Sequence, residues 1–316
     1  MYPTLLLHSL RGRLDWRGAP PKRLVTATKY VLRSLWMARR HARWLSFIHG
    51  SVPMRLLAIQ DPRIYERPQH GYVSRGVSRA GRFDIIESHY QYIASAFPAE
   101  LMRSVYEHGH ASLGRLPLKD GSEFEVRLSL PTGRGREGEL ALYLLQADGS
   151  ALSSMIFTVA DHGHSLLIGC VQGAAGDLGR DAVRAFTRQS YGLRPKNLLL
   201  SMLYALAGAG RIDQIFGVSN KAHPFAGSGK VKADYDSFWQ ECGGVPSDKG
   251  FYRLPPHEPL RDEAQVESKH RSTFRRREAL RHQACELIGQ TFDSRRLLAT
   301  AADLGLPTER ALESAL

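Results

Sequence analysis

The chain has 316 residues, 43% of them hydrophobic, which is enough to bury one core of ordinary domain size with extensions. It has a formal net charge of +12, no run of eighteen apolar residues and no secretory signal pattern, which argues against a membrane-spanning or secreted protein. Its three cysteines, Cys170, Cys242 and Cys285, form neither a disulfide framework nor a C-x-x-C metal pair. These features predict a cytoplasmic protein without a metal ion.

The positive charge is concentrated in two places. Residues 1–55 contain eleven Lys or Arg residues and one acid, Asp15. Residues 269–281 contain six Lys or Arg residues and one acid, Glu278. Clusters of this kind attract phosphate groups on nucleic acid, anionic lipid or a nucleotide cofactor, and the charge alone does not choose among them.

The first predicted element is one basic amphipathic helix over residues 24–48, with Trp36 and Trp44 near the edges of its apolar stripe. Two interpretations stay open. Such a helix can lie in the interface of an anionic membrane, which would make the protein peripheral at the inner membrane. Alternatively, the helix packs on the domain and leaves its charges in water.

Residues 49–82 show no sustained period and are interpreted as a connector with one short strand near 71–75. Periodicity then predicts two helices, four antiparallel strands, a broken helical stretch, a strand, a short helix, a last strand and a charged helical tail. The two helices are predicted at 84–97 and 99–108, and the four strands at 123–130, 139–146, 153–160 and 165–172. The broken helical stretch covers 181–206, the next strand 212–219, the short helix 233–242, the last strand 250–254 and the tail 257–316.

A strand–helix–strand crossover predicts that strands 165–172 and 212–219 run parallel. The predicted fold class is therefore α/β (α+β), with a mixed sheet that combines an antiparallel meander and a βαβ crossover. The domain organisation expected is an N-terminal helical extension and connector (1–82), an α/β core (83–256) and a basic helical tail (257–316).

The glycine-rich stretch after strand 165–172 has the strand–turn–helix order that many folds use to bind phosphate. Gln172, Gly173 and Gly176 are the candidates for this loop, and a tight corner without a ligand is the alternative. Where the crossover helix breaks, Arg188, Arg194 and Lys196 offer cations for a phosphate or carboxylate, or they are simply solvated.

The order of elements over residues 84–255 resembles the GNAT acyltransferase superfamily. That resemblance implies an acyl-CoA in the split between the two parallel strands and a tyrosine on the following helix as the acid for the departing thiolate. Tyr235 is the positional match. Leu178 occupies a position at which the family's phosphate loop has a small residue, and Asp177 would bring a negative charge to the phosphates, so the loop fits poorly.

The chain also resembles the VirK/YbjX family over residues 82–281. The stretches that carry the resemblance are "HYQYIASAF", "GREGEL", "IGCVQG", "TRQSYGLRPKNLLL", "GVSNKAH", "YDSFW" and "KHRSTFRRR". Membership implies a link to virulence and to resistance against cationic antimicrobial peptides, with no settled reaction. The family's signature positions fall on His89, Tyr90, Glu137, Gln172, Gly173, Thr187, Arg188, Arg194, Pro195, Lys196, Asn220, Tyr235, Asp236 and Trp239.

Three functions follow as hypotheses. The first is transfer of an acyl or aminoacyl group, from acyl-CoA or aminoacyl-tRNA, to an amine or hydroxyl of a peptide or envelope component. His89 would be the base and Tyr235 the acid in one cleft. Substrate-binding residues would be Tyr90, Glu137, Asn220, Asp236 and Trp239. The second is a non-catalytic envelope-stress or virulence factor on a degenerate fold, and the third is nucleic-acid binding, for which no specific motif is present.

Overall fold

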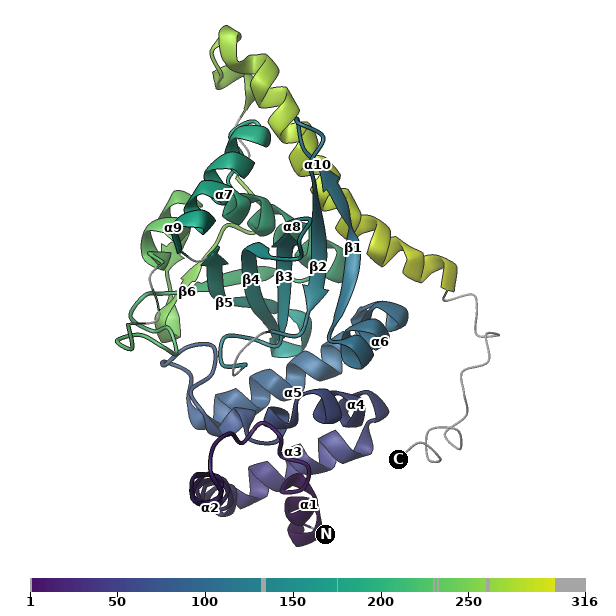
Figure 1. The fold of residues 1–316 in the computed structure, drawn as a ribbon, viewed down its shortest axis with the longest axis vertical. Coiled ribbons are helices and arrows are strands. Elements are labelled where there is room, and N and C mark those ends of the chain that lie inside the picture. The colour runs from purple at the N-terminus through teal and green to yellow at the C-terminus, as the bar shows by residue number, and fades with distance from the viewer. Residues whose placement is uncertain are drawn as a thin grey trace.

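The computed structural model describes residues 2–131, 135–174, 176–229, 231, 233–259 and 262–298. Ala175 of the predicted glycine loop and residues 299–316 of the predicted tail lie outside them, as do the side chains of residues 176–178 and 294–298. One mixed sheet forms the centre, with helices on its faces and across its end (Figure 1). The fold class predicted from the sequence is confirmed.

The sheet has the strand order β1-β2-β3-β4-β5-β6-β8-β7. All described neighbours pair antiparallel except β5 and β6, which are parallel. The strands are β1 (His110–Pro117), β2 (Glu123–Ser129), β3 (Leu140–Leu145), β4 (Ala151–Ala160), β5 (Ser165–Gly173), β6 (Gln214–Val218), β7 (Val245–Pro246) and β8 (Phe251–Arg253). The meander and the parallel crossover are thus present as predicted.

Strand β1 is absent from the sequence-based prediction. Its register against β2 shifts between Ser112 and Gly114, and its exposure does not alternate along the strand. A bulge of this kind removes the period of two on which the prediction of a strand depends. The side chain of Leu287 occupies the space beside Gly114, 2.8 Å from where a Cβ would lie.

The prediction of one helix over residues 24–48 is wrong, because the chain forms α2 (Pro20–Trp36) and α3 (Ala38–Gly50) with a break at Met37. The break lets each helix turn its own buried face to the core, through Tyr30 on α2 and Trp44 on α3. The connector that was expected after them contains α4 (Val52–Gln60) and two short 3-10 helices, and residues 72 and 74 form an isolated bridge rather than a strand. A first helix, α1 (Tyr2–Ser9), precedes them.

The helices after the connector agree with the predictions except at their ends. Ser78 caps α5 (Arg79–Ala96) through its side chain, and Gly109 ends α6 (Ala99–His108) in a left-handed conformation. The crossover consists of α7 (Gly176–Gln189) and α8 (Pro195–Gly210), the latter opened by a proline at its first turn. The last two are α9 (Tyr235–Glu241) and α10 (Ser268–Leu298).

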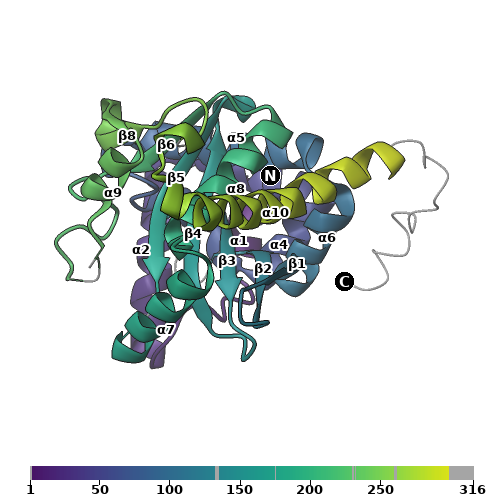
Figure 2. The same cartoon turned by 90° about the horizontal axis from the view of Figure 1, so that it is seen from above.

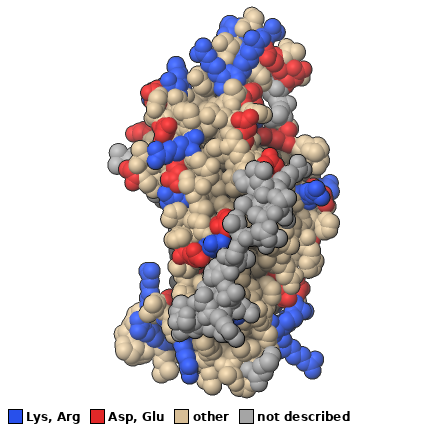
Figure 3. Space-filling view, turned by 90° about the vertical axis from the view of Figure 1, so that its right-hand side faces the viewer, with Lys and Arg blue, Asp and Glu red and all other residues tan. Residues whose placement is uncertain are grey.

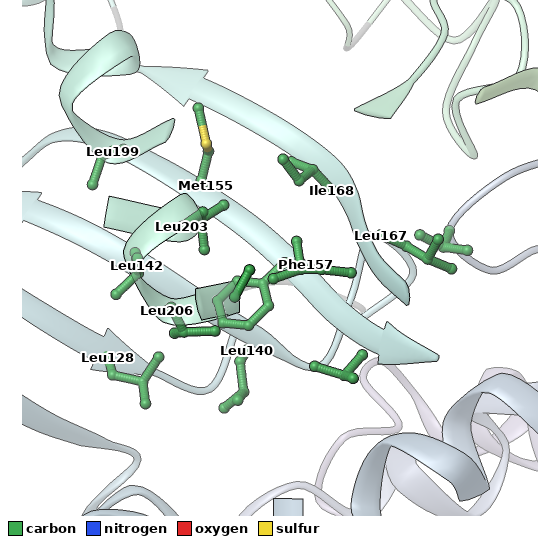
Figure 4. Packing of buried hydrophobic residues seen from close by; sticks show 14 of the residues in the cluster. Leu128, Leu140, Leu142, Met155, Phe157, Leu167, Ile168, Leu199, Leu203 and Leu206 are labelled. Carbon is green, nitrogen blue, oxygen red and sulfur yellow. The ribbon is translucent and has the colours of Figure 1, made fainter. Parts of the chain in front are cut away.

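One hydrophobic core joins the N-terminal helices, the sheet and α10 among the described residues. On one face of the sheet, Leu199, Leu203 and Leu206 of α8 pack on side chains of β2 to β5, which include Leu142 and Phe157 (Figure 4). Helix α10 crosses outside α8 and reaches β1 (Figure 2). Helix α5 lies at the end of the strands, between the sheet and the layer of α1 to α4 (Figure 1).

None of the described helices is both long enough and apolar enough to pass through a bilayer.

Candidate functional site

A pocket of about 500 Å³ opens where the far end of β5 meets the start of α8. Its wall is formed by residues of β4, β5, α7, the α7–α8 turn and α8. They are Ser153, Gly173, Val183, Arg184, Thr187, Arg188, Gly192, Arg194, Pro195 and Lys196. Four of the six residues predicted to bind a phosphate-bearing cofactor line this pocket.

Positive charge dominates the part of the pocket that the structure describes. Arg184, Arg188, Arg194 and Lys196 all line it, and no acidic residue with a described side chain does. Arg194 forms an exposed ion pair with Glu241 at 2.7 Å, and Arg184 pairs with Asp181 at 3.4 Å. Neither pair is buried, so both are screened by water and leave most of the positive potential for a ligand.

Lys196 is the pocket's least exposed cation. Its Nζ lies 4.2 Å from the ring centroid of Phe238 on α9. Partial burial, with a further contribution from Arg194, lowers the pKa of Lys196. An anion beside Nζ would offset both effects, because an opposite charge favours the protonated form.

The start of α8 adds the positive end of a helix dipole, with the Lys196 N–H as its first donor, because Pro195 has no N–H and the Asn197 and Leu198 N–H groups donate to the Arg194 carbonyl oxygen. Arg194 caps the helix without a side-chain hydrogen bond, and Pro195 follows at the first helical position. The aligned peptide dipoles give the N-terminal end of a helix a partial positive charge. The pocket therefore combines side-chain cations with the positive end of a 16-residue helix.

Gln172 and Gly176 are the remaining residues predicted for the cofactor. Gln172 is exposed next to the last residue of β5, and its backbone oxygen accepts a hydrogen bond from Ser153 Oγ at 3.0 Å. Gly176 begins α7, and its surroundings lie outside the described residues. The two stand at the ends of the glycine loop that leads from Gly173 into α7.

Tyr235 lies at the split between β5 and β6. The two strands pair only from Ser165 to Ile168 on β5, so the last residues of β5 diverge from β6. The Val171 N–H donates to the Tyr235 hydroxyl oxygen at 3.3 Å, and that oxygen lies 3.4 Å from the Val171 carbonyl oxygen. Tyr235 is 3% exposed and fills this part of the split.

Four side chains from separate parts of the chain meet beside that hydroxyl. Tyr235 Oη is 3.4 Å from Cys170 Sγ, and the Tyr235 ring stacks on His223 with centroids 5.2 Å apart. His223 Nε2 is 3.1 Å from Glu137 Oε1. Burial, assisted by the Glu137 charge, raises the pKa of Cys170, so the thiol stays protonated.

Glu137, Cys170 and His223 place three potential metal donors within 4.8 Å of one another. The histidine ring, however, accepts a hydrogen bond at Nδ1 from the Phe225 N–H at 3.1 Å. In a neutral ring the proton is then on Nε2, facing Glu137, whereas a metal-bound histidine normally donates from its other nitrogen. We interpret the group as a buried histidine whose Nε2 lies within ion-pair distance of a carboxylate.

Cys170 and His223 were not among the predicted site residues. No short-range spacing connects them to Glu137 or Tyr235. Each nevertheless lies in a stretch that carries the family resemblance, "IGCVQG" and "GVSNKAH", and this was the available signal.

His89 does not meet Tyr235. Its Nδ1 accepts a hydrogen bond from the Val159 N–H of β4 at 3.1 Å, and Val159 pairs with Leu166 near the start of β5. Leu166 and Val171 are five residues apart, which is roughly 16 Å along a strand. His89 is fully buried, and burial together with the Arg67 charge lowers its pKa to about 3. The predicted shared cleft is not formed by these two residues.

Tyr90 belongs to a buried ion network instead of an open site. Its hydroxyl donates to Glu139, which also pairs with Arg67, and Arg67 pairs in turn with Asp61. Burial alone would lower the pKa of Arg67, but Glu139 and Asp61 outweigh it and raise the pKa.

Asn220, Asp236 and Trp239 hold α9 in place. The Asn220 side chain accepts from the Tyr235 N–H at 2.8 Å, and the Asn220 N–H donates to Asp236 at 2.8 Å. The Trp239 indole donates to the Val218 carbonyl oxygen at 2.8 Å. The three side chains therefore fix the position of Tyr235 on the sheet.

Comparison with known proteins agrees with the resemblance to the VirK/YbjX family that the sequence shows. The chain is 27% identical over 257 residues to an uncharacterized protein, YbjX, of Escherichia coli K12, covering 79% of this chain and 78% of that protein. Two uncharacterized proteins of Haemophilus influenzae are 30% and 28% identical over 169 and 158 residues, covering 52% and 48% of this chain and 56% and 53% of their own lengths. No solved structure matches. A family model described as a protein of unknown function (DUF535) matches residues 21–288, and the chain belongs to that family.

Proposed function

We propose that this protein binds a phosphate-bearing donor, an acyl-CoA or an aminoacyl-tRNA, in the pocket between α7 and α8. The acyl or aminoacyl group would pass to an amine or hydroxyl of a peptide or cell-envelope component. The observation that carries the proposal is the gathering of four cations and a helix N-terminus around one pocket. Guanidinium forks and helix N-termini are the usual partners of phosphate oxygens.

The position of the pocket relative to Tyr235 supports the transfer step. Gly173 of the pocket is two residues beyond Val171, which hydrogen-bonds Tyr235, a separation of roughly 7 Å along β5. Phe238, under Lys196, is one turn beyond Tyr235 on α9. A donor anchored by its phosphates would therefore reach the split between β5 and β6. This is the place at which the resemblance to GNAT acyltransferases implies an acyl-CoA.

In this proposal, Tyr235 is the general acid. Burial, reinforced by Cys170, raises the pKa of Tyr235, so the hydroxyl keeps its proton. With an acyl-CoA donor, the acceptor nitrogen bonds to the acyl carbon, the carbon–sulfur bond breaks and the Tyr235 proton passes to the departing thiolate.

The acceptor must also lose a proton, and we assign this step to Glu137 in place of His89. Glu137 has a partly exposed side chain within 4.8 Å of Cys170 Sγ, the atom that Tyr235 also contacts. His89, with its Nδ1 lone pair occupied and no exposed atom, is a structural residue.

Binding is tested by calorimetric titration with CoA, inorganic pyrophosphate and aminoacyl-tRNA. We expect Arg188→Glu to weaken binding at least ~10-fold, because it replaces a charge-assisted contact by repulsion. Arg115→Glu is the matched control, since Arg115 is an exposed arginine on β1 that does not line the pocket. Equal affinity of both variants would contradict the assignment of the pocket.

Catalysis is tested separately with Tyr235→Phe. The donor affinity should stay the same while turnover falls ~100-fold, because only the proton donor is lost. Unchanged turnover would remove Tyr235 from the mechanism.

The non-catalytic alternative is favoured by one observation. The Tyr235 hydroxyl already hydrogen-bonds to the N–H and the carbonyl oxygen of Val171 in the split, so these backbone groups are not open to a substrate. In that case the protein binds a phosphate-bearing ligand without converting it. Tight binding without turnover for every acyl donor and acceptor tested would favour this alternative.

A further inference from the structure

Helix α2 has an outer apolar face in addition to the face that packs on the protein. On the inner side, Tyr30 and Ser34 are buried. On the outer side, five large apolar side chains are between 52% and 68% exposed. They are Leu24, Val25, Leu32, Leu35 and Trp36, named here the outer stripe.

The outer stripe is continuous. At 100° per residue, its five members fall within about 120° of the helix circumference, with only Pro21 and Thr28 between them. The described residues contain nine strongly exposed large apolar side chains, and only Val245 lies outside the first 60 residues. Exposed apolar surface is therefore concentrated in the N-terminal helices, which distinguishes it from the scattered residues found on most proteins.

Basic residues flank the outer stripe. Lys22, Lys29 and Arg33 follow its edge along α2, and α2 contains no acid. The whole segment 1–55 has eleven Lys or Arg residues and one acid, which is bound to Arg13. In Figure 3, Lys and Arg atoms lie at the lower end of the molecule, where α1 to α4 lie, as well as at its upper end.

Trp36 ends the outer stripe in a geometry suited to an interface. The guanidinium carbon of Arg79, from the start of α5, lies 3.9 Å from the Trp36 ring centroid. An indole with one apolar face and a neighbouring cation is the combination found at the headgroup level of membranes.

We propose that α2 lies on the surface of an anionic lipid bilayer, with the outer stripe among the acyl chains at the headgroup boundary and its basic flank on the lipid phosphates. A helix with an apolar face and a Lys/Arg-rich polar face binds membranes in this orientation. A second copy of the chain is the less suitable occupant, because two outer stripes in contact would bring their basic flanks together without an acid on α2 to offset them.

The inference does not depend on the proposed transferase activity. It assigns membrane contact to the face of α2 opposite to the face that packs on the core. A membrane-bound protein therefore keeps the fold described here. The inner face of α2 and the buried side of α3, on which Trp44 and Ile48 are fully buried, hold the outer stripe in position.

The test is cosedimentation of the full chain with vesicles of phosphatidylcholine and phosphatidylglycerol, and with vesicles of phosphatidylcholine alone. The double variant Leu32→Ser, Leu35→Ser should bind the anionic vesicles at least ~10-fold more weakly, because two apolar side chains no longer leave water. The matched control is Ile59→Ser, Val245→Ser, which removes two comparably exposed apolar side chains outside the outer stripe. The control should bind like the parent protein, and phosphatidylcholine alone should bind far less.

A second measurement follows Trp36. Trp44 and Trp239 are fully buried, whereas Trp16 is half-buried beside Arg13 and Trp36 is exposed. A blue shift of fluorescence on adding anionic vesicles that is lost in Trp36→Phe would therefore report insertion of the outer stripe, and a shift kept in that variant would come from Trp16. Equal vesicle binding by the outer-stripe variant and the control would overturn the proposal. A dimer in sedimentation equilibrium that the outer-stripe variant dissociates, without vesicle binding by the parent, would also overturn it in favour of a second copy.

Discussion

His89 and His41 show how burial decides what a histidine can do. Both rings are fully buried, and both hydrogen-bond to the backbone, His89 with the Val159 N–H and His41 with the Tyr65 carbonyl oxygen. Burial lowers the pKa of His89 to about 3 and that of His41 to about 4. In the unfolded chain both would titrate near 6.5, so the folded and unfolded states bind different numbers of protons in weak acid.

The direction of the pH effect follows from that difference. Between about pH 6.5 and about pH 4, the unfolded state takes up protons that the folded state excludes, so stability falls as the pH falls. Each histidine contributes a slope of up to ~1.4 kcal/mol per pH unit, and neither contributes above about pH 7.

We expect His89→Asn to reduce this acid sensitivity. The Asn carbonyl oxygen replaces Nδ1 as acceptor for the Val159 N–H and cannot be protonated in this range. The free energy of unfolding is measured by urea titration from about pH 6.5 to about pH 4.5. Its slope against pH should be smaller in the variant than in the parent by up to ~1.4 kcal/mol per pH unit. The remaining slope belongs partly to His41, and a variant with the same slope as the parent would contradict a neutral, buried His89.

At the scale of elements, α9 is a seven-residue helix that depends on side-chain bonds for its position. Asn220, in the segment after β6, accepts from the Tyr235 N–H and donates to Asp234, each at 2.8 Å. Asp234 in turn caps the helix by accepting from the Ser237 N–H. A helix this short gains little stability from its own backbone, so these contacts determine where Tyr235 lies.

Asn220→Ala should therefore destabilise the protein by about 1–2 kcal/mol, the expected effect of losing a helix cap and its partner. Thermal and urea unfolding measure this change. Lys221→Ala, an exposed neighbour, is the control and should stay within about 0.5 kcal/mol of the parent. An equal effect of the two substitutions would show that α9 does not need the Asn220 bonds.

For the whole molecule, the three segments expected from the sequence, 1–82, 83–256 and 257–316, share one core among the described residues. Trp44 of α3 is fully buried and its indole donates to the Ile64 carbonyl oxygen at 3.0 Å. At the other end of the chain, Phe292 of α10 packs edge-on against Phe97 with ring centroids 4.9 Å apart. Removing residues 1–50 would therefore remove part of the core.

The two tryptophans on either side of the α2–α3 break provide a direct comparison. Trp44→Ala should lower the free energy of unfolding by about 3–5 kcal/mol, because a large buried side chain leaves a cavity. Trp36→Ala, at an exposed position, should lower it by no more than about 1 kcal/mol, the contribution of the exposed cation–π contact with Arg79. Circular dichroism and fluorescence should report one coincident transition in each case; a separate early transition in Trp44→Ala would mean that the N-terminal helices unfold on their own.

The sequence by itself determined the fold class, the meander, the parallel crossover and the break before Pro195, because these depend on local periodicity, turn residues and proline geometry. It also indicated the cations of the α7–α8 pocket, since Arg188, Arg194 and Lys196 lie close together along the chain. Local patterns could not indicate the bulged strand β1 or the break at Met37, where the packing of distant elements overrides the helical period.

Only the tertiary structure decided the environment of each candidate side chain. It separated His89 from Tyr235, and it brought Glu137, Cys170 and His223 together from three distant stretches. It also divided the basic helical segment into a buried part around Trp44 and an exposed stripe that ends at Trp36. Burial, protonation and contact depend on which surfaces meet after the chain has folded, and the spacing of residues along a sequence does not contain that information.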